Sequence, residues 1–375
     1  MSGRPKITWV IPSMGMGGTE RQLLYLMEGL KDNFELNLVC TRRRGSYYDR
    51  AAPYCETVTC LNAASAWSPR LGLQLKNIFK RTRPDIVHSF QFGFDLHANR
   101  AARKAGVPVV VSSRRELPIW MKGRHRWMQR RANRYVDCIV ANSRAAAEYA
   151  AKHEPAHPDL FEVIPNGIDA SQFKARETPT AFRRYLGIPD VGPVVGMVAN
   201  FSPVKDHGLF LKMAEHLIAR VPHIHFLLVG SGAGEKNIRA AIAARQLTQH
   251  FTLVEAQENI AEYYNVMDVA VLTSKVEGLP NAVMESMVCG VPTVGAAVGG
   301  IPELIRDGET GRIITIRSQE TFSDAVKALL EDSAAADSIA QQAKAWVQQA
   351  RSMDKMVTTH RELYERLLSE KGVRD

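Results

Sequence analysis

The chain has 375 residues, of which 45% are hydrophobic and 23% charged, and its net charge is +9. This length exceeds what one hydrophobic core usually organises, so we expect two globular domains, and the composition excludes a disordered chain. No apolar run approaches the roughly 20 residues that span a bilayer, and the five cysteines lack metal-type spacing. We therefore expect a cytoplasmic protein with reduced thiols, no signal peptide and no membrane-spanning helix.

Strand-like runs alternate with helical patterns over the first 170 residues. The expected strands are apolar and rich in β-branched residues: Ile7–Pro12, Glu35–Cys40, Asp85–Phe90, Pro108–Ser113, Val136–Ala141 and Phe161–Pro165. The expected helices between them include Glu20–Lys31, Leu71–Lys80 and Leu96–Ala105. Strands that alternate with helices of this length predict a doubly wound parallel sheet.

A second series of the same kind follows the polar stretch Ala170–Pro179, which we interpret as an interdomain linker. Its expected strands are Val194–Ala199, His225–Val229, Phe251–Val254, Asp268–Thr273 and Pro292–Ala296. Three further helices are expected at Thr321–Leu330, Ala334–Ala350 and Asp354–Leu368. The sequence therefore predicts an α/β protein with two Rossmann-like, doubly wound parallel-sheet domains, at residues 1–170 and 171–353, that face a cleft.

The most informative segment begins where the strand Asp268–Thr273 ends. Glu277 lies in the following loop, and Glu285 lies eight positions later on the helix Ala282–Gly290, for which Asn281 is the expected N-cap. A helix N-terminus with free backbone N–H groups suits a diphosphate or sugar oxygens, and the two carboxylates can hold hydroxyls on two parts of one ligand. The alternative is a solvated loop glutamate and an ordinary helix glutamate.

Further motifs in the same order extend over nearly the whole chain. They are Gly17–Glu20 (G-G-T-E), Asn142-Ser143, Val163–Asp169 (V-I-P-N-G-I-D), Glu277–Asn281 (E-G-L-P-N), Glu285, Gly299–Glu303 (G-G-I-P-E), Gly308 and Thr310-Gly311. Together they resemble the retaining, nucleotide-sugar-dependent glycosyltransferases of family 4, which share the two-Rossmann GT-B architecture. The resemblance implies that the last helix, residues 354–375, returns to the N-terminal domain.

The resemblance also implies how a nucleoside diphosphate sugar is held. Gly17 and Gly18 would close over the donor diphosphate, although they could merely form a tight turn. Lys205 would reach the same diphosphate. Asn200 stands where the family usually has arginine, so charge compensation falls more heavily on Lys205 and on backbone amides. Metal clamping is not expected, because the chain contains no Asp-x-Asp motif.

Other donor contacts follow from the same resemblance. Gly230 and Gln257 would line the nucleoside pocket, Glu277 would orient the sugar and favour its developing positive charge, and Glu285 would hold the ribose. The remaining residues expected at the donor are Gly278, Leu279, Pro280 and Asn281. No cofactor besides this co-substrate is expected.

Three candidates lie at strand ends in the N-terminal domain. His88 is expected to hydrogen-bond the transferred sugar or the acceptor as a catalytic residue, or else to be a core histidine satisfied by its neighbours. Arg114 and Asn142 are expected to contact the acceptor.

Positive charge is concentrated in the N-terminal half, where residues 1–170 hold 26 Lys/Arg against 15 Asp/Glu. In the run from Arg114 to Arg134 the basic residues alternate with Trp120, Met121, Trp127 and Met128. This pattern suits an anionic membrane surface or a phosphate-bearing acceptor, or a solvated basic face that packs its tryptophans inward. No nucleic-acid-binding signature accompanies the charge.

The sequence thus predicts a retaining, metal-independent glycosyltransferase that moves a sugar to a glycan or lipid-linked acceptor in polysaccharide or glycolipid assembly. It would be cytoplasmic and peripheral at the inner face of the membrane. One alternative is a sugar-nucleotide epimerase or phosphorylase on the same fold. The other is a non-catalytic, membrane-associated protein that binds nucleotide sugars.

Overall fold

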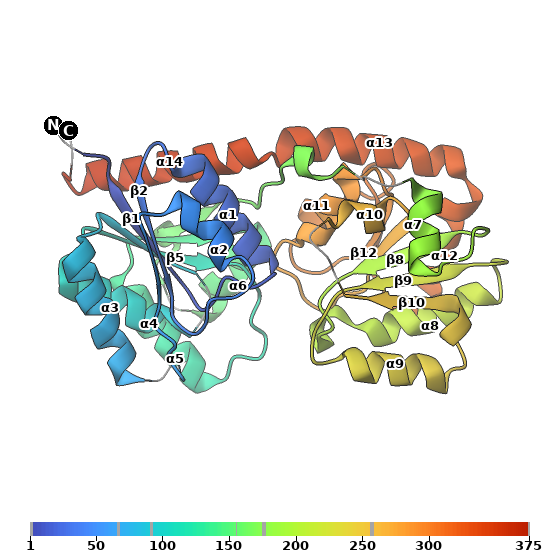
Figure 1. Ribbon diagram of the computed structural model, residues 1–375, viewed down its shortest axis with the longest axis horizontal. Coiled ribbons are helices and arrows are strands. Elements are labelled where there is room, and N and C mark those ends of the chain that lie inside the picture. Colours follow the sequence, from blue (N-terminus) through green and yellow to red (C-terminus); the bar gives the residue numbers. More distant parts are fainter. Residues whose placement is uncertain are drawn as a thin grey trace. The chain divides into compact units, whose positions relative to one another are not determined.

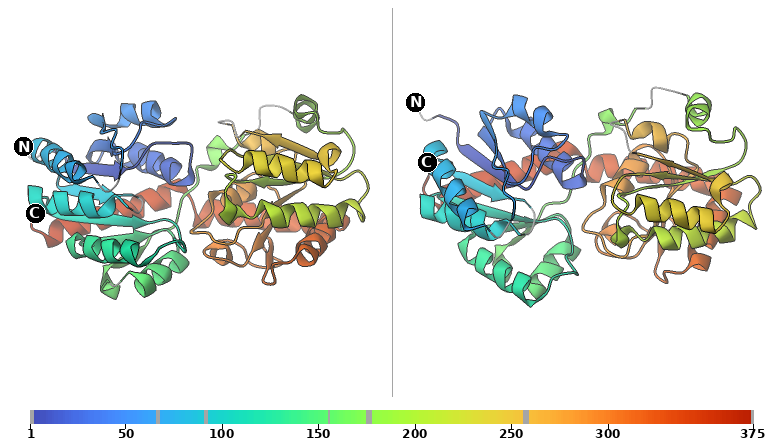
Figure 2. Two further views of the ribbon diagram at one scale, coloured as in Figure 1. Left: turned by 90° about the horizontal axis from the view of Figure 1, so that it is seen from below. Right: turned by 60° about the horizontal axis from the view of Figure 1, so that its bottom comes forward.

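Two parallel β-sheets organise the chain, one in each of two structural units (Figure 1). The computed structural model describes residues 3–65, 68–90, 93–154, 156–174, 178–255 and 259–373. The first unit comprises Met1–Gly167 and Met353–Asp375, and the second comprises Ile168–Ser352. In each unit helices cover both faces of the sheet (Figure 2), which confirms the predicted class of two Rossmann-like α/β sheets.

The first sheet has seven parallel strands in the spatial order β3-β2-β1-β4-β5-β6-β7. They are β1 (Lys6–Ile11), β2 (Glu35–Cys40), β3 (Thr57–Cys60), β4 (Ile86–Ser89), β5 (Val109–Arg114), β6 (Cys138–Ala141) and β7 (Phe161–Val163). The order reverses direction between β1 and β4. Ligands of doubly wound sheets bind beyond the carboxyl ends of the strands at such a switch point.

Each face of the first sheet buries its own apolar cluster. Helices α1 (Gly18–Leu30) and α14 (Met353–Glu370) cover one face, and α3 (Pro69–Thr82) and α4 (Asp95–Ala105) cover the other. Val109 and Val111 belong to the cluster under α1 and α14, whereas Val110 belongs to the cluster under α4. The period-two alternation of β5 therefore sends odd-numbered side chains to one face and even-numbered side chains to the other.

Shorter elements complete the first unit. They are α2 (Tyr48–Ala51), α5 (Gly123–Ala132), α6 (Arg144–His153) and the 3-10 turns Ala52–Tyr54, Asn133–Tyr135 and Pro158–Leu160.

The second sheet has six parallel strands in the order β10-β9-β8-β11-β12-β13. They are β8 (Val194–Val198), β9 (His225–Val229), β10 (Phe251–Val254), β11 (Val269–Leu272), β12 (Thr293–Ala296) and β13 (Arg312–Ile314). The helices are α7 (Pro179–Leu186), α8 (His207–Ile218), α9 (Glu235–Ala244), α10 (Ala261–Tyr264), α11 (Asn281–Val288), α12 (Gln319–Glu331) and α13 (Ser333–Ala350). The 3-10 turns are Ala170–Gln172, Pro203–Lys205, Thr248–His250 and Ile301–Glu303. The switch point here lies between β8 and β11.

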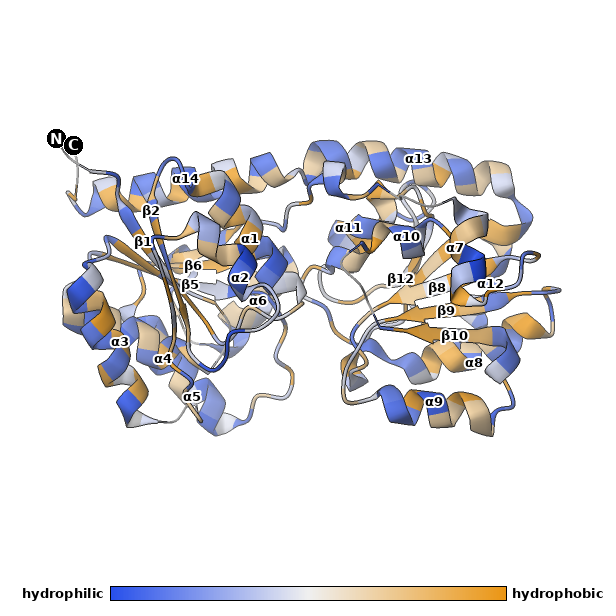
Figure 3. Ribbon diagram, viewed as in Figure 1, coloured by the Kyte–Doolittle hydropathy of each residue, from blue (hydrophilic) through white to orange (hydrophobic). Residues whose placement is uncertain are grey.

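The strands consist mainly of hydrophobic residues, whereas the helices carry hydrophobic and hydrophilic residues on different sides (Figure 3). The central strands read as nearly continuous apolar runs because both of their faces are buried. The expected strands Glu35–Cys40, His225–Val229 and Phe251–Val254 match β2, β9 and β10 residue for residue.

Two details of the prediction are wrong. The sequence analysis assigned no strand to Thr57–Cys60 or Arg312–Ile314, and both are short outer strands, β3 and β13. The predicted N-cap at Asn281 is also wrong, since Pro280 occupies the cap position with extended backbone and Asn281 is the first residue of α11. Because a proline side chain has no oxygen, this helix begins without a side-chain cap.

Candidate functional site

Lys205 and Glu277 form the centre of a charged site at the switch point of the second sheet. Lys205 ends the turn after β8, and Glu277 lies in the loop after β11. The Lys205 Nζ and Glu277 Oε1 atoms are 2.5 Å apart, and the Ser274 hydroxyl donates a second hydrogen bond of 2.6 Å to the same oxygen. The Lys205 side chain is 20% exposed and that of Glu277 only 9%, so water screens this ion pair weakly.

The Glu277 loop is held in place by the glycine pair of the G-G-I-P-E motif. Gly299 has a φ of +54°, and a Cβ atom there would lie 1.8 Å from the carbonyl oxygen of Glu277. The Gly300 amide donates a hydrogen bond of 2.9 Å to the carbonyl of Gly278. Two motifs that are separate in the sequence thus form one rigid backbone unit around the carboxylate.

Glu285 is the fifth residue of α11, about one turn from the start of the helix, and is buried. The Tyr264 hydroxyl donates to the Ala282 carbonyl at 2.9 Å and lies 3.4 Å from Glu285 Oε2. The local sequence therefore does place one glutamate in the loop and one inside the helix. A contact of Glu285 with ribose stays a prediction.

Further cations surround Lys205 that the sequence analysis did not identify. Arg317 donates to Asp206 Oδ2 at 2.6 Å and to the Thr273 carbonyl at 3.0 Å. The Lys275 ammonium lies 3.5 Å from Asp206 Oδ1. Lys205, Lys275 and Arg317 therefore outnumber Asp206 and Glu277 by one charge. Their spacing in the sequence, across more than 100 residues, gives no local signal that would group them.

The other predicted donor residues lie at or near the carboxyl edge of the second sheet. Asn200 is exposed and follows β8 directly after Ala199. Gly230 follows β9, where a Cβ atom would lie 2.0 Å from the Ala199 carbonyl oxygen. Leu279 and Pro280 are buried between the Glu277 loop and α11. The predicted contact at Gln257 lies outside the described residues.

In the first unit, Gly17 is the N-cap of α1 and Gly18 is the first residue of that helix. The Glu20 carboxylate folds back against Gly17, where a Cβ atom would meet Glu20 Oε2 at 2.3 Å. Burial raises the pKa of Glu20 above its ordinary value. Binding of a diphosphate by this loop stays a prediction.

His88 lies on β4 and is fully buried. One ring nitrogen, Nδ1, lies 2.7 Å from the Tyr364 hydroxyl on α14, and the other, Nε2, lies 2.8 Å from the Ser113 hydroxyl. Burial holds the pKa of His88 well below its ordinary value, so the ring is neutral at pH 7. This geometry favours the core-histidine interpretation, and a direct catalytic contact stays a prediction.

Arg114 is buried in an ionic network under α4 and α5. Its guanidinium lies 2.7 Å from Glu154 Oε2 and 3.2 Å from Asp95 Oδ2, and it donates to Asn133 Oδ1 at 2.8 Å. Its hydrogen-bonding capacity is thus largely used within the unit, which favours a structural role; contact with an acceptor stays a prediction.

Arg115 turns to the opposite face of the sheet, and the sequence analysis missed it. Its guanidinium lies 5.7 Å from the centre of the Phe90 ring and donates to Asn166 Oδ1 at 2.5 Å. Asn142, the other predicted acceptor residue, is buried, and its Nδ2 donates to the Arg115 carbonyl at 3.1 Å. The signal that could have found Arg115 is the strand period, which places consecutive residues on opposite faces.

The basic segment at residues 119–134 exposes its aromatic side chains. Ile119, Trp120 and Trp127 are 56%, 51% and 56% exposed, whereas Met121 and Met128 are buried. The interpretation that the tryptophans pack inward is therefore wrong. Exposed cations surround them at Lys122, Arg124, Arg126, Arg130, Arg131 and Arg134. The segment contains no acidic residue.

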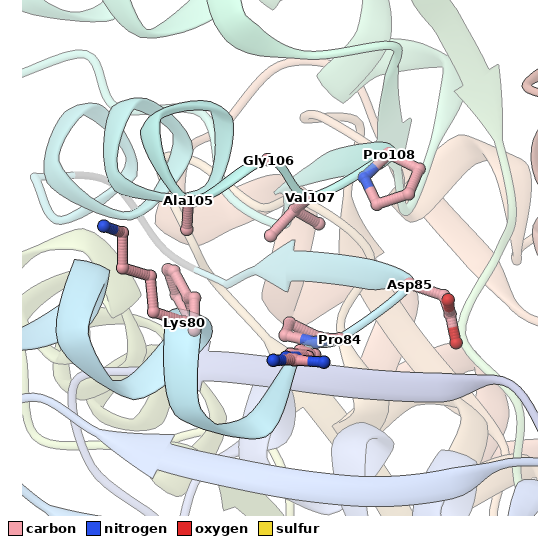
Figure 4. Close-up of a pocket in the computed structure, with 9 residues that line it drawn as sticks. Lys80, Pro84, Asp85, Ala105, Gly106, Val107 and Pro108 are labelled. Atoms are coloured by element: carbon pink, nitrogen blue, oxygen red, sulfur yellow. The ribbon is translucent and has the colours of Figure 1, made fainter.

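A cavity of about 460 Å³ lies at the amino ends of β4 and β5, the opposite edge of the first sheet (Figure 4). Lys80, Arg83 and Asp85 line it together with residues 79, 84 and 105–108. Its position before the strands separates it from the loops that carry the candidate residues.

Within the residue ranges that the structure describes, no helix combines the length and apolar character needed to cross a bilayer. No group of three or more His, Cys, Asp or Glu side chains there is placed to hold a metal ion.

Two family models match the chain, one in each unit. Residues 16–172 match the model described as Glycosyltransferase Family 4, and residues 180–346 match Glycosyl transferases group 1.

Curated relatives carry related names. A D-inositol 3-phosphate glycosyltransferase of Geodermatophilus obscurus is 31% identical over 206 residues, which cover 52% of this chain and 45% of that protein. The chain spans slightly less than half the length of this relative. A UDP-Gal:alpha-D-GlcNAc-diphosphoundecaprenol alpha-1,3-galactosyltransferase of Escherichia coli is 24% identical over 334 residues, covering 84% of this chain and 86% of that one.

Solved structures share the fold over nearly the whole chain. Anabaena Alr3699/HepE, crystallised with UDP and glucose, superposes with a TM-score of 0.87 at 20% identity, covering 97% of this chain and all of that one. WaaG, a glycosyltransferase involved in lipopolysaccharide biosynthesis, gives a TM-score of 0.77 at 13% identity, with 95% and 99% covered.

Proposed function

Since the chain belongs to the glycosyltransferases of family 4 and has the GT-B fold, we propose that it transfers a sugar from a nucleoside diphosphate sugar to a glycan or lipid-linked acceptor, with retention at the anomeric carbon. The observation that carries the proposal is the weakly screened Lys205–Glu277 ion pair at the switch point of the second sheet. A site that pairs one ammonium with one carboxylate suits a ligand that is anionic at one end and hydroxylated at the other.

Donor binding would exchange partners within this ion pair. The Lys205 ammonium turns from Glu277 to the diphosphate, where it stabilises the charge that develops as the leaving group departs. Glu277 then accepts hydrogen bonds from sugar hydroxyls and favours positive charge on the ring. The backbone N–H groups at the start of α11 add donors for phosphate or sugar oxygens.

Arg317 and Lys275 would supply the positive charge that Asn200 does not. Both lie next to Lys205 and share the single carboxylate of Asp206. The reaction then needs no divalent cation at the diphosphate. Glu285 would hold the ribose from α11.

Acceptor binding is assigned to the carboxyl edge of the first sheet, and membrane contact to the segment around α5. Exposed tryptophan within a field of cations, without acidic residues, suits the interface of an anionic bilayer. The E. coli relative, whose name specifies a diphosphoundecaprenol-linked substrate, supports a lipid-linked acceptor.

Thermal unfolding with a panel of nucleotides tests the donor half of the proposal. We expect one of UDP, GDP or ADP, or its sugar conjugate, to raise the melting temperature, because a ligand that binds only the folded state stabilises it. Lys205→Gln should reduce that shift, and Lys174→Gln, at an exposed lysine of the same unit, should not. The absence of a shift with every nucleotide would refute donor binding.

Product analysis then tests the transfer. With the nucleotide sugar so identified and a prenyl-diphosphate-linked monosaccharide as acceptor, we expect a disaccharide product with the donor's anomeric configuration, formed in the presence of a chelator. An inverted product, or a requirement for divalent metal, contradicts the corresponding part of the mechanism. An altered sugar nucleotide formed without any acceptor would instead indicate an epimerase.

A further inference from the structure

We propose that Arg115 binds a phosphate group of the acceptor at the carboxyl edge of the first sheet. This inference rests on the glycosyl transfer proposed above and adds the chemical class of its acceptor.

The alternation of β5 determines where Arg115 lies. Ser113 faces His88 and α14, Arg114 faces the opposite side under α4 and α5, and Arg115 returns to the side of Ser113. At that position it follows β5 at the carboxyl edge, next to Phe90, the residue after β4. The guanidinium therefore lies at the end of the sheet where a doubly wound fold binds ligands.

The charge of Arg115 is not compensated as that of its neighbour is. Arg114 contacts two carboxylates, whereas the Arg115 guanidinium donates to the neutral amide of Asn166. Within the described part of the chain, no carboxylate oxygen lies within 4.0 Å of the Arg115 guanidinium. Arg115 is half-buried, and a guanidinium that loses water contacts without gaining a counter-charge carries a cost that a bound anion offsets.

Electrostatics agree with this geometry. Burial is the main cause that lowers the pKa of Arg115, to about 10, and the negative charge of Glu20 opposes the change. The side chain therefore stays cationic at neutral pH. Its planar donors match a phosphate better than a single ammonium would.

The surrounding loops hold Arg115 in a fixed position. Asn142 donates to the Arg115 carbonyl, and its own Oδ1 is buried without a hydrogen-bond partner among the described residues. Asn166 accepts from the guanidinium, and Gln22 fixes the adjacent Gly167 through two hydrogen bonds of 2.8 and 2.9 Å. A site that is already ordered loses less entropy on binding.

Glu20 adds a second function at this edge. Its carboxylate lies against Gly17 in the loop that follows β1 and contributes to the electrostatic environment of Arg115. A carboxylate accepts hydrogen bonds from hydroxyl groups and repels phosphate. Glu20 and Arg115 together therefore suit an acceptor that carries both hydroxyls and a phosphate.

Calorimetric titration with defined probes tests the inference. Farnesyl diphosphate represents a lipid-linked phosphate, glucose 1-phosphate a soluble one, and farnesol the lipid alone. We expect the wild-type protein to bind at least one phosphate probe and not farnesol, and Arg115→Gln to weaken that binding at least tenfold. Binding of farnesyl diphosphate alone indicates a lipid-linked acceptor, whereas equal binding of glucose 1-phosphate indicates a soluble one.

The control variant is Arg83→Gln, which removes an exposed arginine from the cavity at the other end of the sheet. It should bind the phosphate probe as the wild type does, and a loss in this variant would move the phosphate site to that cavity. Unchanged affinity in Arg115→Gln, or no phosphate binding by the wild type, overturns the proposal.

A parallel titration with the active nucleoside diphosphate separates the two proposals. If the nucleotide binds and Arg115→Gln weakens the binding of the phosphate probe alone, both the donor proposal and the Arg115 proposal are supported. If no nucleotide binds, the donor proposal fails, and the phosphate probes still test the role of Arg115. Should Arg115→Gln not fold, Arg115→Lys keeps the charge and loses the bidentate fork. Wild-type affinity in Arg115→Lys would then overturn the assignment, because several-fold weakening is expected.

Discussion

The His88 imidazole and the Tyr364 hydroxyl lie 2.7 Å apart and join β4 to α14, a helix 276 residues later in the chain. Trp9 Nε1 also donates to the Tyr364 hydroxyl, at 3.4 Å. All three side chains are fully buried, so water cannot replace either partner. The last helix is therefore attached to the first unit by a polar contact within an otherwise apolar cluster.

Tyr364→Phe removes this hydroxyl and leaves the ring in place. We expect the free energy of unfolding to fall by about 1–3 kcal/mol, because His88 Nδ1 and Trp9 Nε1 lose a buried partner. Urea denaturation measures the change. The matched control is Tyr185→Phe, at a side chain that is 79% exposed, and it should change stability little. Equal stability of both variants would show that the buried hydrogen bonds contribute nothing.

Buried neutral histidines predict a loss of stability in acid. Burial lowers the pKa of His207, His225 and His360 to about 4, and it holds the pKa of His88 well below its ordinary value. In the unfolded chain their pKa is about 6.5, so below that pH the unfolded state binds more protons and the free energy of unfolding falls. The loss begins near pH 6.5 and continues until the folded-state pKa is reached.

His360→Gln isolates one of these groups. A displacement from 6.5 to about 4 corresponds to roughly 3 kcal/mol at most, so the wild type should lose up to that much more stability than the variant between pH 6.5 and 4. Denaturation at a series of pH values measures the difference. His157→Gln, at an exposed histidine, should keep the wild-type pH dependence. Parallel curves for wild type and His360→Gln would contradict the assignment. Burial raises the pKa of Asp95 to about 6, so this group makes the folded state more stable as the pH falls. Its contribution has the opposite sign to that of the histidines and is the same in the wild type and in both variants.

The central elements of the fold followed from the sequence because buried parallel strands are nearly continuous apolar runs. The outer strands β3 and β13 gave little signal: T-V-T-C and R-I-I are short and only partly buried. The Glu277 loop and α11 were predictable for a different reason: their residues form one continuous segment of the chain, so the motif is visible in the sequence. Arg317 joins the same site from a distant segment, so only the folded chain brings it there.

Side-chain direction was the weakest part of the prediction. Arg114 was named as an acceptor residue and Arg115 was not considered, although a shift of one residue in a strand exchanges the two faces of the sheet. In the same way, the alternation of basic and apolar residues around α5 indicated a basic, aromatic-bearing segment but not which of Trp127 and Met128 faces the core. Both choices depend on packing against elements that are far away in the sequence.

Neutral substitutions of Glu277 and of Lys205 should have different effects on the affinity for the nucleoside diphosphate. Glu277→Gln removes the carboxylate that occupies the Lys205 ammonium, so the active nucleoside diphosphate should bind as well as before or several-fold more tightly, while turnover falls at least 100-fold. Lys205→Gln should weaken nucleotide binding by about tenfold. Titration calorimetry and initial rates measure both. Full activity in Glu277→Gln would remove it from the catalytic site.

Gly299→Ala tests whether the second glycine motif sets the position of Glu277. The new methyl group would meet the Glu277 carbonyl oxygen at 1.8 Å, so the loop must move. We expect activity to fall at least tenfold and stability by about 1–3 kcal/mol. Gly290→Ala is the matched control, since it also has positive φ, +72°, but open space around its Cβ position. If both variants behave alike, backbone strain alone explains the loss and the loop contact is unimportant.

Trp120 and Trp127 should control attachment to anionic membranes. Their side chains are about half exposed, and the Arg131 guanidinium lies 4.9 Å from the centre of the Trp127 ring, so aromatic surface and charge meet at one place. Replacing both tryptophans by alanine should weaken binding to phosphatidylglycerol vesicles at least tenfold, because two interfacial anchors are lost. Sedimentation with vesicles measures the bound fraction.

The control is Tyr185→Ala, which removes an exposed aromatic side chain from the other unit and should bind as the wild type does. Binding to neutral phosphatidylcholine vesicles should be much weaker, and salt should reduce binding to the anionic ones. Equal sedimentation of the double variant and the wild type would show that this segment is not the membrane contact.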